Sequence, residues 1–118
     1  MSKRRSLLLV DDDNLVLATT SRGLQAAGYD TRTAQSVEDA LELLADFTPD
    51  LALLDIRMGK QGGFELARVL RDRHAIPFVF LSAYDDADTV EEATELGAVG
   101  FLVKPVDETR LLDAVRNA

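Results

Sequence analysis

The chain has 118 residues, which is enough to bury the core of one domain but short for several domains. We therefore expect a single domain over residues 1–118. A content of 47% hydrophobic and 29% charged residues is ordinary for a globular chain and argues against disorder. The net charge of −8 argues against nonspecific binding to nucleic acids or anionic membranes, and the absence of cysteine excludes disulfides and thiolate chemistry.

Five short runs with strand character alternate with five runs in which apolar residues recur at helical spacing. The strands are predicted over residues 7–10, 29–34, 51–54, 76–81 and 100–103, and the helices over residues 14–27, 36–47, 64–70, 89–96 and 108–115. Four of the strands are apolar throughout, which is typical of strands covered on both faces, while 29–34 has mixed polarity and is expected at a sheet edge. Strands joined by single helices predict an α/β fold with a parallel sheet between two helical layers.

The predicted boundaries coincide with residues that begin and end helices. Asp13 and Asp107 stand directly before predicted helices and Ser36 begins one, where their side chains can accept hydrogen bonds from free backbone N–H groups. Gly28 and Gly97 follow the first and the fourth predicted helix, as glycine commonly does at a helix end. The helices are therefore expected to be separate elements with defined ends.

The residues that follow the buried strands are polar and complementary in charge. Asp11 and Asp12 follow the first strand, Asp55 the third, Ser82 the fourth and Lys104 the fifth. In a parallel sheet these positions meet at the edge where open α/β sheets bind their ligands. Each residue alone could be a helix cap, a turn residue or a solvated charge. Their coincidence at four strand ends favours a functional site.

A divalent cation and a phosphoryl group would suit this set of side chains. Carboxylates about 4 Å apart repel by roughly 4 kcal/mol per pair at an effective dielectric constant near 20, so positive charge must lie among them. Lys104 supplies one charge, and Mg²⁺ suits a site with one or two carboxylates, a carbonyl and waters. Asp55 beside these charges is predicted to be a nucleophile toward phosphorus, and Ser82 can donate a hydrogen bond to the product.

The segments that contain these residues, LLLVDDD, PDLALLDIRM, FVFLSA and GFLVKP, resemble the receiver domain of two-component response regulators in order and spacing. The resemblance covers the whole chain. It implies a doubly wound (βα)5 three-layer sandwich of flavodoxin-like topology, with a five-stranded parallel sheet in the order 2-1-3-4-5. It also implies a phosphoacceptor switch that catalyses only its own phosphorylation and dephosphorylation.

The resemblance further implies a role for each site residue. Asp55 would be the phosphoacceptor, Asp12 a direct ligand of Mg²⁺, and Asp11 a ligand acting largely through water. The carbonyl oxygen of Arg57 would complete the protein's share of the metal ligands. Arg57 and Tyr84 would tune the lifetime of the phosphoryl group, and we expect both side chains to shield it from water.

The switch residues follow from the same resemblance. Ser82 would turn its hydroxyl toward the phosphoryl group, and Lys104 would form an ion pair with that group. The Lys104-Pro105 bond would be cis. Phe101 would swing inward with the switch, although plain core packing remains an alternative for an aromatic residue in a strand. The surface formed by the fourth helix, fifth strand and fifth helix would then change partners.

The partners implied are a sensor histidine kinase or phosphotransfer protein and a downstream effector domain or protein, with a phosphorylation-dependent homodimer left open. A cytoplasmic location is expected. No apolar run approaches the roughly 20 residues that cross a membrane, so no membrane is expected as a partner. Because of the net charge of −8, no nucleic acid is expected as a partner of this domain.

The loop after Asp55 departs from the family pattern. Gly59 stands where a proline is usual, and Gly62 stands where an aspartate usually precedes the next glycine. The two glycines make the loop more flexible and remove a side-chain cap from the following helix. This departure slightly favours an alternative function, a receiver-like interaction module that works without phosphorylation, whereas the intact set of acids and Lys104 argue against it.

Two other functions were weighed against the switch. A Mg²⁺-dependent phosphohydrolase with an aspartyl intermediate needs a second acid two residues after its nucleophile, and this chain has Arg57 there. A flavin-binding protein of this topology would need a phosphate-binding loop after the first strand, where the acidic residues would repel the phosphate. Both alternatives fit the sequence less well than the switch.

Overall fold

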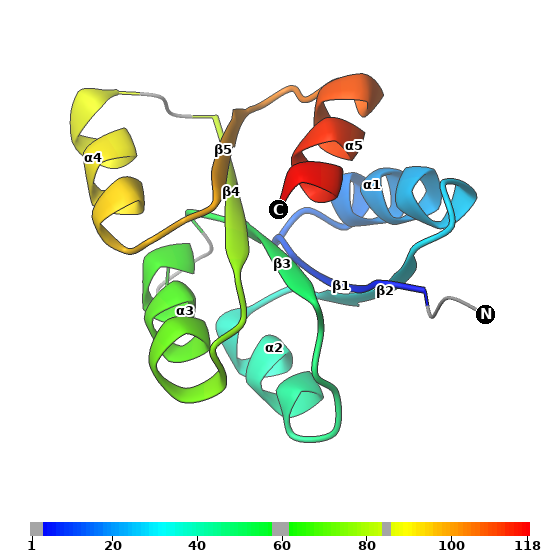
Figure 1. The fold of residues 1–118 in the computed structure, drawn as a ribbon, viewed down its shortest axis with the longest axis horizontal. Helices are drawn as coiled ribbons and strands as arrows, with labels where there is room; N and C mark the ends of the chain where they lie inside the picture. The colour runs from blue at the N-terminus through cyan, green and yellow to red at the C-terminus, as the bar shows by residue number, and fades with distance from the viewer. Residues whose placement is uncertain (1–3, 58–61, 84–85) are drawn as a thin grey trace.

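The computed structural model describes residues 4–57, 62–83 and 86–118. Five strands form one parallel sheet in the order β2-β1-β3-β4-β5, which confirms the predicted topology (Figure 1). The strands are β1 (Ser6–Val10), β2 (Asp30–Ala34), β3 (Leu51–Asp55), β4 (Phe78–Ser82) and β5 (Gly100–Val103).

Helices cover both faces of the sheet, as the alternating pattern predicted. They are α1 (Asn14–Ala26), α2 (Val37–Leu44), α3 (Gly63–Val69), α4 (Ala87–Glu95) and α5 (Glu108–Asn117). One hydrophobic cluster joins the sheet to α2, α3 and α4, and a second joins the other face to α1 and α5. The three-layer sandwich in Figure 1 follows from these two clusters.

Helix starts follow the capping residues closely. Asp13, Ser36 and Asp107 accept hydrogen bonds from backbone N–H groups of the helices they precede, as predicted. The prediction for the fourth helix began too late, because Asp86 caps it by accepting from the backbone N–H and the hydroxyl of Thr89. The helix therefore starts two residues before Thr89.

Two helix ends differ from the prediction. The second helix ends at Leu44 instead of extending to residue 47. The third helix continues beyond the predicted end as a π-helical turn, η1 (Leu70–His74), where the sequence is charged and gives no apolar spacing to follow. Ala75 then adopts a left-handed conformation with φ 53°, and the N–H of Ile76 donates to the carbonyl of Leu70.

The register of the sheet places the ends of β1, β3, β4 and β5 at one edge. Val10 pairs with Leu54, so Asp11 and Asp55 both follow paired strand ends. Ser82 is the last residue of β4 and pairs with Val103, directly before Lys104. Among the described residues, no helix has the length and apolar character needed to cross a membrane.

Candidate functional site

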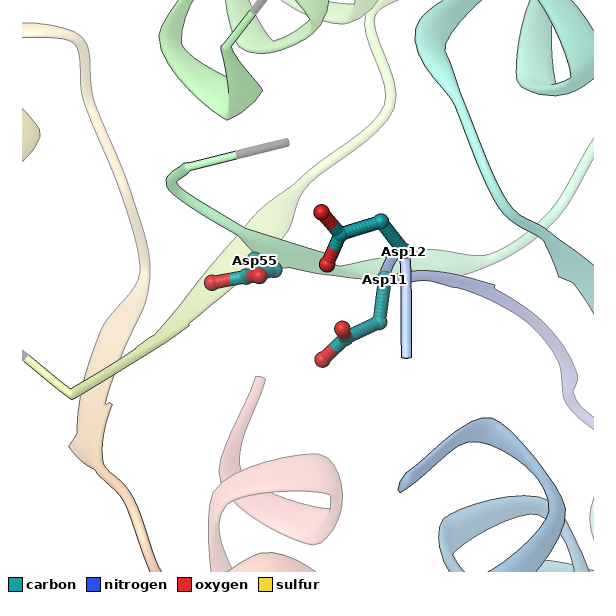
Figure 2. A group of neighbouring side chains, drawn as sticks. All are labelled: Asp11, Asp12 and Asp55. Carbon is teal, nitrogen blue, oxygen red and sulfur yellow. The ribbon is translucent and has the colours of Figure 1, made fainter. Parts of the chain in front are cut away.

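Three carboxylates meet at this edge of the sheet. Figure 2 shows the side chains of Asp11 and Asp12 leaving the end of β1 and the side chain of Asp55 leaving the end of β3. One carboxylate oxygen from each lies within 4.8 Å of the others. Asp11 is buried, Asp55 is partly buried and Asp12 is exposed. The structure thus brings together the acids that the strand ends predicted.

Lys104 lies beside two of these acids. Its Nζ atom is 2.6 Å from Oδ2 of Asp11 and 3.6 Å from Oδ2 of Asp55. Its backbone N–H donates to the carbonyl of Ser82 at 2.7 Å, which fixes the end of β5 to the end of β4. Burial lowers the pKa of Lys104, but the hydrogen bond to Asp11 and the neighbouring carboxylates raise it, so that the pKa lies above its usual value. The lysine therefore stays protonated.

The two acids after β1 have different surroundings. Oδ1 of Asp11 accepts a hydrogen bond from the backbone N–H of Asp13 at 2.9 Å, and Oδ2 accepts from Lys104. Both oxygens of Asp11 therefore already have protein donors, whereas Asp12 is exposed at the mouth of the site. That Asp12 is the more direct metal ligand stays a prediction.

The carboxyl group of Asp55 is harder to ionise than that of a free aspartate. Burial raises the pKa of its carboxyl from the ordinary 3.8 to about 6, although the charge of Lys104 lowers it. Asp11 and Asp12 raise this pKa further by repulsion, and a hydrogen bond from the backbone N–H of Arg57 lowers it. The ionised site thus contains more negative charge than Lys104 compensates.

A hard divalent cation fits that charge imbalance. The three carboxylates offer oxygen ligands within the reach of one ion, and oxygen is the ligand that Mg²⁺ prefers. Asp11, Asp12 and Asp55 are the residues that could hold the ion. When bound, the ion would stabilise the carboxylates and the negative charge of a phosphoryl group beside them.

The remaining site residues lie in different places. Ser82 is buried with 1% of its surface exposed, at the end of the strand beside Asp55. Phe101 is partly buried and packs against the core cluster under α2, α3 and α4, so its position fits both the switch and the core-packing alternative. The Lys104-Pro105 bond is cis, as expected. Tyr84 lies outside the described residues.

Arg57 is exposed and stands two residues after Asp55. Hydrogen bonds from the hydroxyl and backbone N–H of Thr89 lower the pKa of Asp86, and the charge of Arg57 lowers it further. The charge of Arg57 therefore acts on the cap of α4.

Comparison with known proteins identifies the family. The model of the response regulator receiver domain matches residues 7–116. The chain belongs to the response regulator receiver family. Receiver domains are signalling switches of two-component systems and not enzymes in the ordinary sense. The predicted family and fold are both confirmed.

Relatives and solved structures agree with this assignment. The receiver is 38% identical over 109 residues to the transcriptional regulatory protein AfsQ1 of Streptomyces coelicolor, covering 92% of this chain and 48% of that protein. It therefore spans about half the length of that relative. The Vibrio cholerae chemotaxis protein CheY4 superposes with a TM-score of 0.91 at 28% identity, covering 97% of this chain and 98% of that one.

A third solved structure contains a modified site. It is a response regulator protein from Burkholderia pseudomallei, described as having a phosphorylated aspartic acid, a calcium ion and citrate. The receiver superposes on it with a TM-score of 0.86 at 28% identity, covering 93% of this chain and 65% of that one.

One residue of the site region was missed as a structural determinant. Gly63 had no predicted role of its own in the glycine-rich loop after Asp55, but its backbone lies directly against the end of β3. The glycine directly before the apolar spacing of the third helix was a signal of close backbone approach, because glycine alone permits it. The spacing gave no indication of which backbone it approaches.

Proposed function

We propose that this receiver accepts a phosphoryl group on Asp55 from the phosphohistidine of a sensor kinase or phosphotransfer protein, with Mg²⁺. The proposal rests on the cluster of Asp11, Asp12 and Asp55, whose carboxylate oxygens lie within 4.8 Å of one another, with Lys104 3.6 Å from Asp55. Structural roles such as helix capping do not require this set of charges to lie together at one edge of the sheet.

The transfer is a displacement at phosphorus. An oxygen of the Asp55 carboxylate forms the new O–P bond while the P–N bond to the histidine breaks, and the histidine nitrogen keeps the electron pair of that bond. Lys104 lies close enough to shift from the carboxylate to a phosphoryl oxygen, and the hydroxyl of Ser82 donates to another. Asp11 holds Lys104 in place through its 2.6 Å contact.

Phosphorylation would change the surface formed by α4, β5 and α5. A phosphoryl group adds up to two negative charges and three acceptor oxygens. Ser82 and Lys104 stand at the starts of the connections that lead to α4 and α5, so their movement toward the group would reposition both connections. Phe101, partly buried in β5, would move inward with them.

Further proposals concern the setting of this switch. We treat residues 1–118 as one receiver domain, which the single sheet supports. AfsQ1 is a transcriptional regulatory protein, which supports an effector of that class as the partner downstream, with a phosphorylation-dependent homodimer as one form of the response. The cytoplasm is the compartment that fits such partners.

The deciding experiment is intact mass spectrometry after incubation with acetyl phosphate and Mg²⁺. A single phosphoryl adduct is expected on the wild type, and its loss in Asp55→Asn and without Mg²⁺ would support the proposal. The absence of an adduct under conditions that label other receivers would favour a phosphorylation-independent interaction module. The lack of a side-chain cap at Gly62 is the observation that speaks for that second function.

We also propose that Arg57 and Tyr84 prolong the phosphorylated state by shielding the phosphoryl group from water. Arg57 stands two residues after Asp55, and its charge acts on Asp86. Arg57→Ala and Tyr84→Ala should each accelerate loss of the adduct several-fold, measured by mass spectrometry after removal of the phosphodonor. Decay at the wild-type rate or slower would contradict the shielding role.

A further inference from the structure

Gly63, the first residue of α3, lies with its backbone against the strand end that contains Asp55. Its N–H donates to the carbonyl of Ile56 at 2.6 Å. A Cβ atom built on Gly63 would lie 3.0 Å from both the carbonyl carbon of Asp55 and the Cα of Ile56, and it would overlap the carbonyl oxygen of Asp55. All three atoms belong to backbone, which cannot move aside as a flexible side chain can.

The hydrogen bond from the N–H of Gly63 to Ile56 gives the start of α3 a partner where a side-chain cap is missing. Gly62 occupies the N-cap position of α3, and no side chain there accepts a hydrogen bond from the helix. The carbonyl of Ile56 takes that role for the N–H of Gly63. The start of α3 is therefore joined to the backbone of the site, so the departure from the family pattern at Gly62 does not leave the helix end without a partner.

The same short stretch of backbone determines where the acceptor points. The Asp55 carboxylate accepts a hydrogen bond from the backbone N–H of Arg57, two residues on. The peptide between Asp55 and Ile56 lies inside the turn that this bond closes. A shift of that peptide therefore moves the carboxylate of Asp55 and the backbone of Arg57 together.

We infer that Gly63 is a positioning residue for the phosphoacceptor: its backbone contact with Asp55 and Ile56 holds the carboxylate of Asp55 and the carbonyl of Arg57 in place for metal binding and phosphoryl transfer. The inference rests on the proposed function of Asp55. A side chain at Gly63 would push the turn outward, and a misplacement of about 1 Å in a reacting group can slow a reaction by about 100-fold.

The test compares Gly63→Ala with Gly62→Ala. Gly62 is a matched control because its added Cβ would approach the Ile56 carbonyl oxygen at 3.0 Å without meeting Asp55, and its extended backbone (φ −96°, ψ 166°) accepts any residue. Both variants are also made together with Gly23→Ala, so that a variant that is only less stable can still be measured in the folded state. That change adds a helix-favouring residue inside α1, where the nearest atom to the new Cβ is Oε1 of Glu108 at 3.8 Å.

Three quantities are measured on each full chain: the Mg²⁺ dissociation constant by calorimetry, the initial phosphorylation rate with acetyl phosphate at saturating Mg²⁺, and the folded fraction by circular dichroism. Gly63→Ala is expected to weaken Mg²⁺ binding by about tenfold and to slow phosphorylation by roughly 10- to 100-fold while remaining folded. Gly62→Ala is expected to change both quantities clearly less than Gly63→Ala does, because its Cβ meets the carbonyl oxygen of Ile56 but not Asp55.

Several results would overturn the inference. Wild-type Mg²⁺ binding and phosphorylation in Gly63→Ala would leave Gly63 with no role in the site. A loss of phosphorylation no larger than the unfolded fraction, or failure of Gly63→Ala to fold even with Gly23→Ala, would leave it with a structural role. An equal loss in Gly62→Ala would mean that the contact with Asp55 is not the cause. If the wild type itself forms no adduct, the proposed function fails. The Mg²⁺ dissociation constants then still decide whether Gly63 positions the acidic site.

Discussion

Oppositely charged side chains meet both in the site and on the outer surface of the helices, with different consequences. In the site, the side chains of Lys104 and Asp11 are 22% and 7% exposed and 2.6 Å apart. On α5, Arg116 and Asp113 are 65% and 60% exposed and 3.9 Å apart. The second pair is solvated and screened by water, whereas burial strengthens the interaction within the first pair, so the same chemistry matters for stability in one region and little in the other.

The largest effect on stability is expected from removing the site's cation. Lys104→Met leaves two neighbouring acids, the buried Asp11 and the partly buried Asp55, without the positive charge that lies beside them. The free energy of unfolding should fall by about 3 kcal/mol in urea titrations without Mg²⁺ at pH 7.5. The control is Arg110→Met, which breaks the exposed pair with Asp107 and keeps the same change of side chain. Equal losses in both variants would remove the distinction between the two regions.

The next largest effect is a gain in stability when the negative charge of Asp55 is removed. Because burial raises the pKa of Asp55 to about 6 in the folded chain, against 3.8 for the free group, the folded state binds its proton more tightly than the unfolded state. The contribution of Asp55 to stability therefore falls as pH rises from about 4 to about 6 and stays low above that range. Asp55→Asn should raise the free energy of unfolding by about 1–2 kcal/mol at pH 7.5 without Mg²⁺.

The difference between Asp55→Asn and wild type should shrink toward zero near pH 4, where the folded wild type is already protonated at this position. Urea titrations at pH 4, 5, 6 and 7.5 would measure it. A difference that is constant with pH would show that the gain comes from packing and not from charge. Mg²⁺ at 100 times its dissociation constant should stabilise the wild type by about 2.7 kcal/mol and the variant much less.

The smallest effect is expected on the exposed pair. Asp113→Asn should change the free energy of unfolding by less than about 0.5 kcal/mol, and less still in 0.5 M salt, because the pair with Arg116 is solvated and lies 3.9 Å apart. Thermal unfolding at two salt concentrations measures it. A loss above 1 kcal/mol would mean that the surface of α5 contributes more than its exposure implies.

Much of the fold and of the site followed from local pattern. Apolar runs that end in Asp11, Asp55, Ser82 and Lys104 are a property of the sequence, and a parallel sheet has to bring such ends to one edge. The sequence could not predict that Asp86 begins α4 or that a π-helical turn extends α3 to His74, because charged residues on a helix surface leave no apolar spacing to read.

By itself the sequence determined the order of elements, the acidic edge and the identity of its lysine, since each follows from burial and strand direction alone. Only the tertiary structure decided how those groups share charge: that Lys104 lies closer to Asp11 than to Asp55, and that Asp55 has its pKa raised to about 6. It also decided that Gly63 touches the backbone of Asp55. Distances between residues far apart in the chain depend on the packing of the whole sheet, which no local pattern specifies.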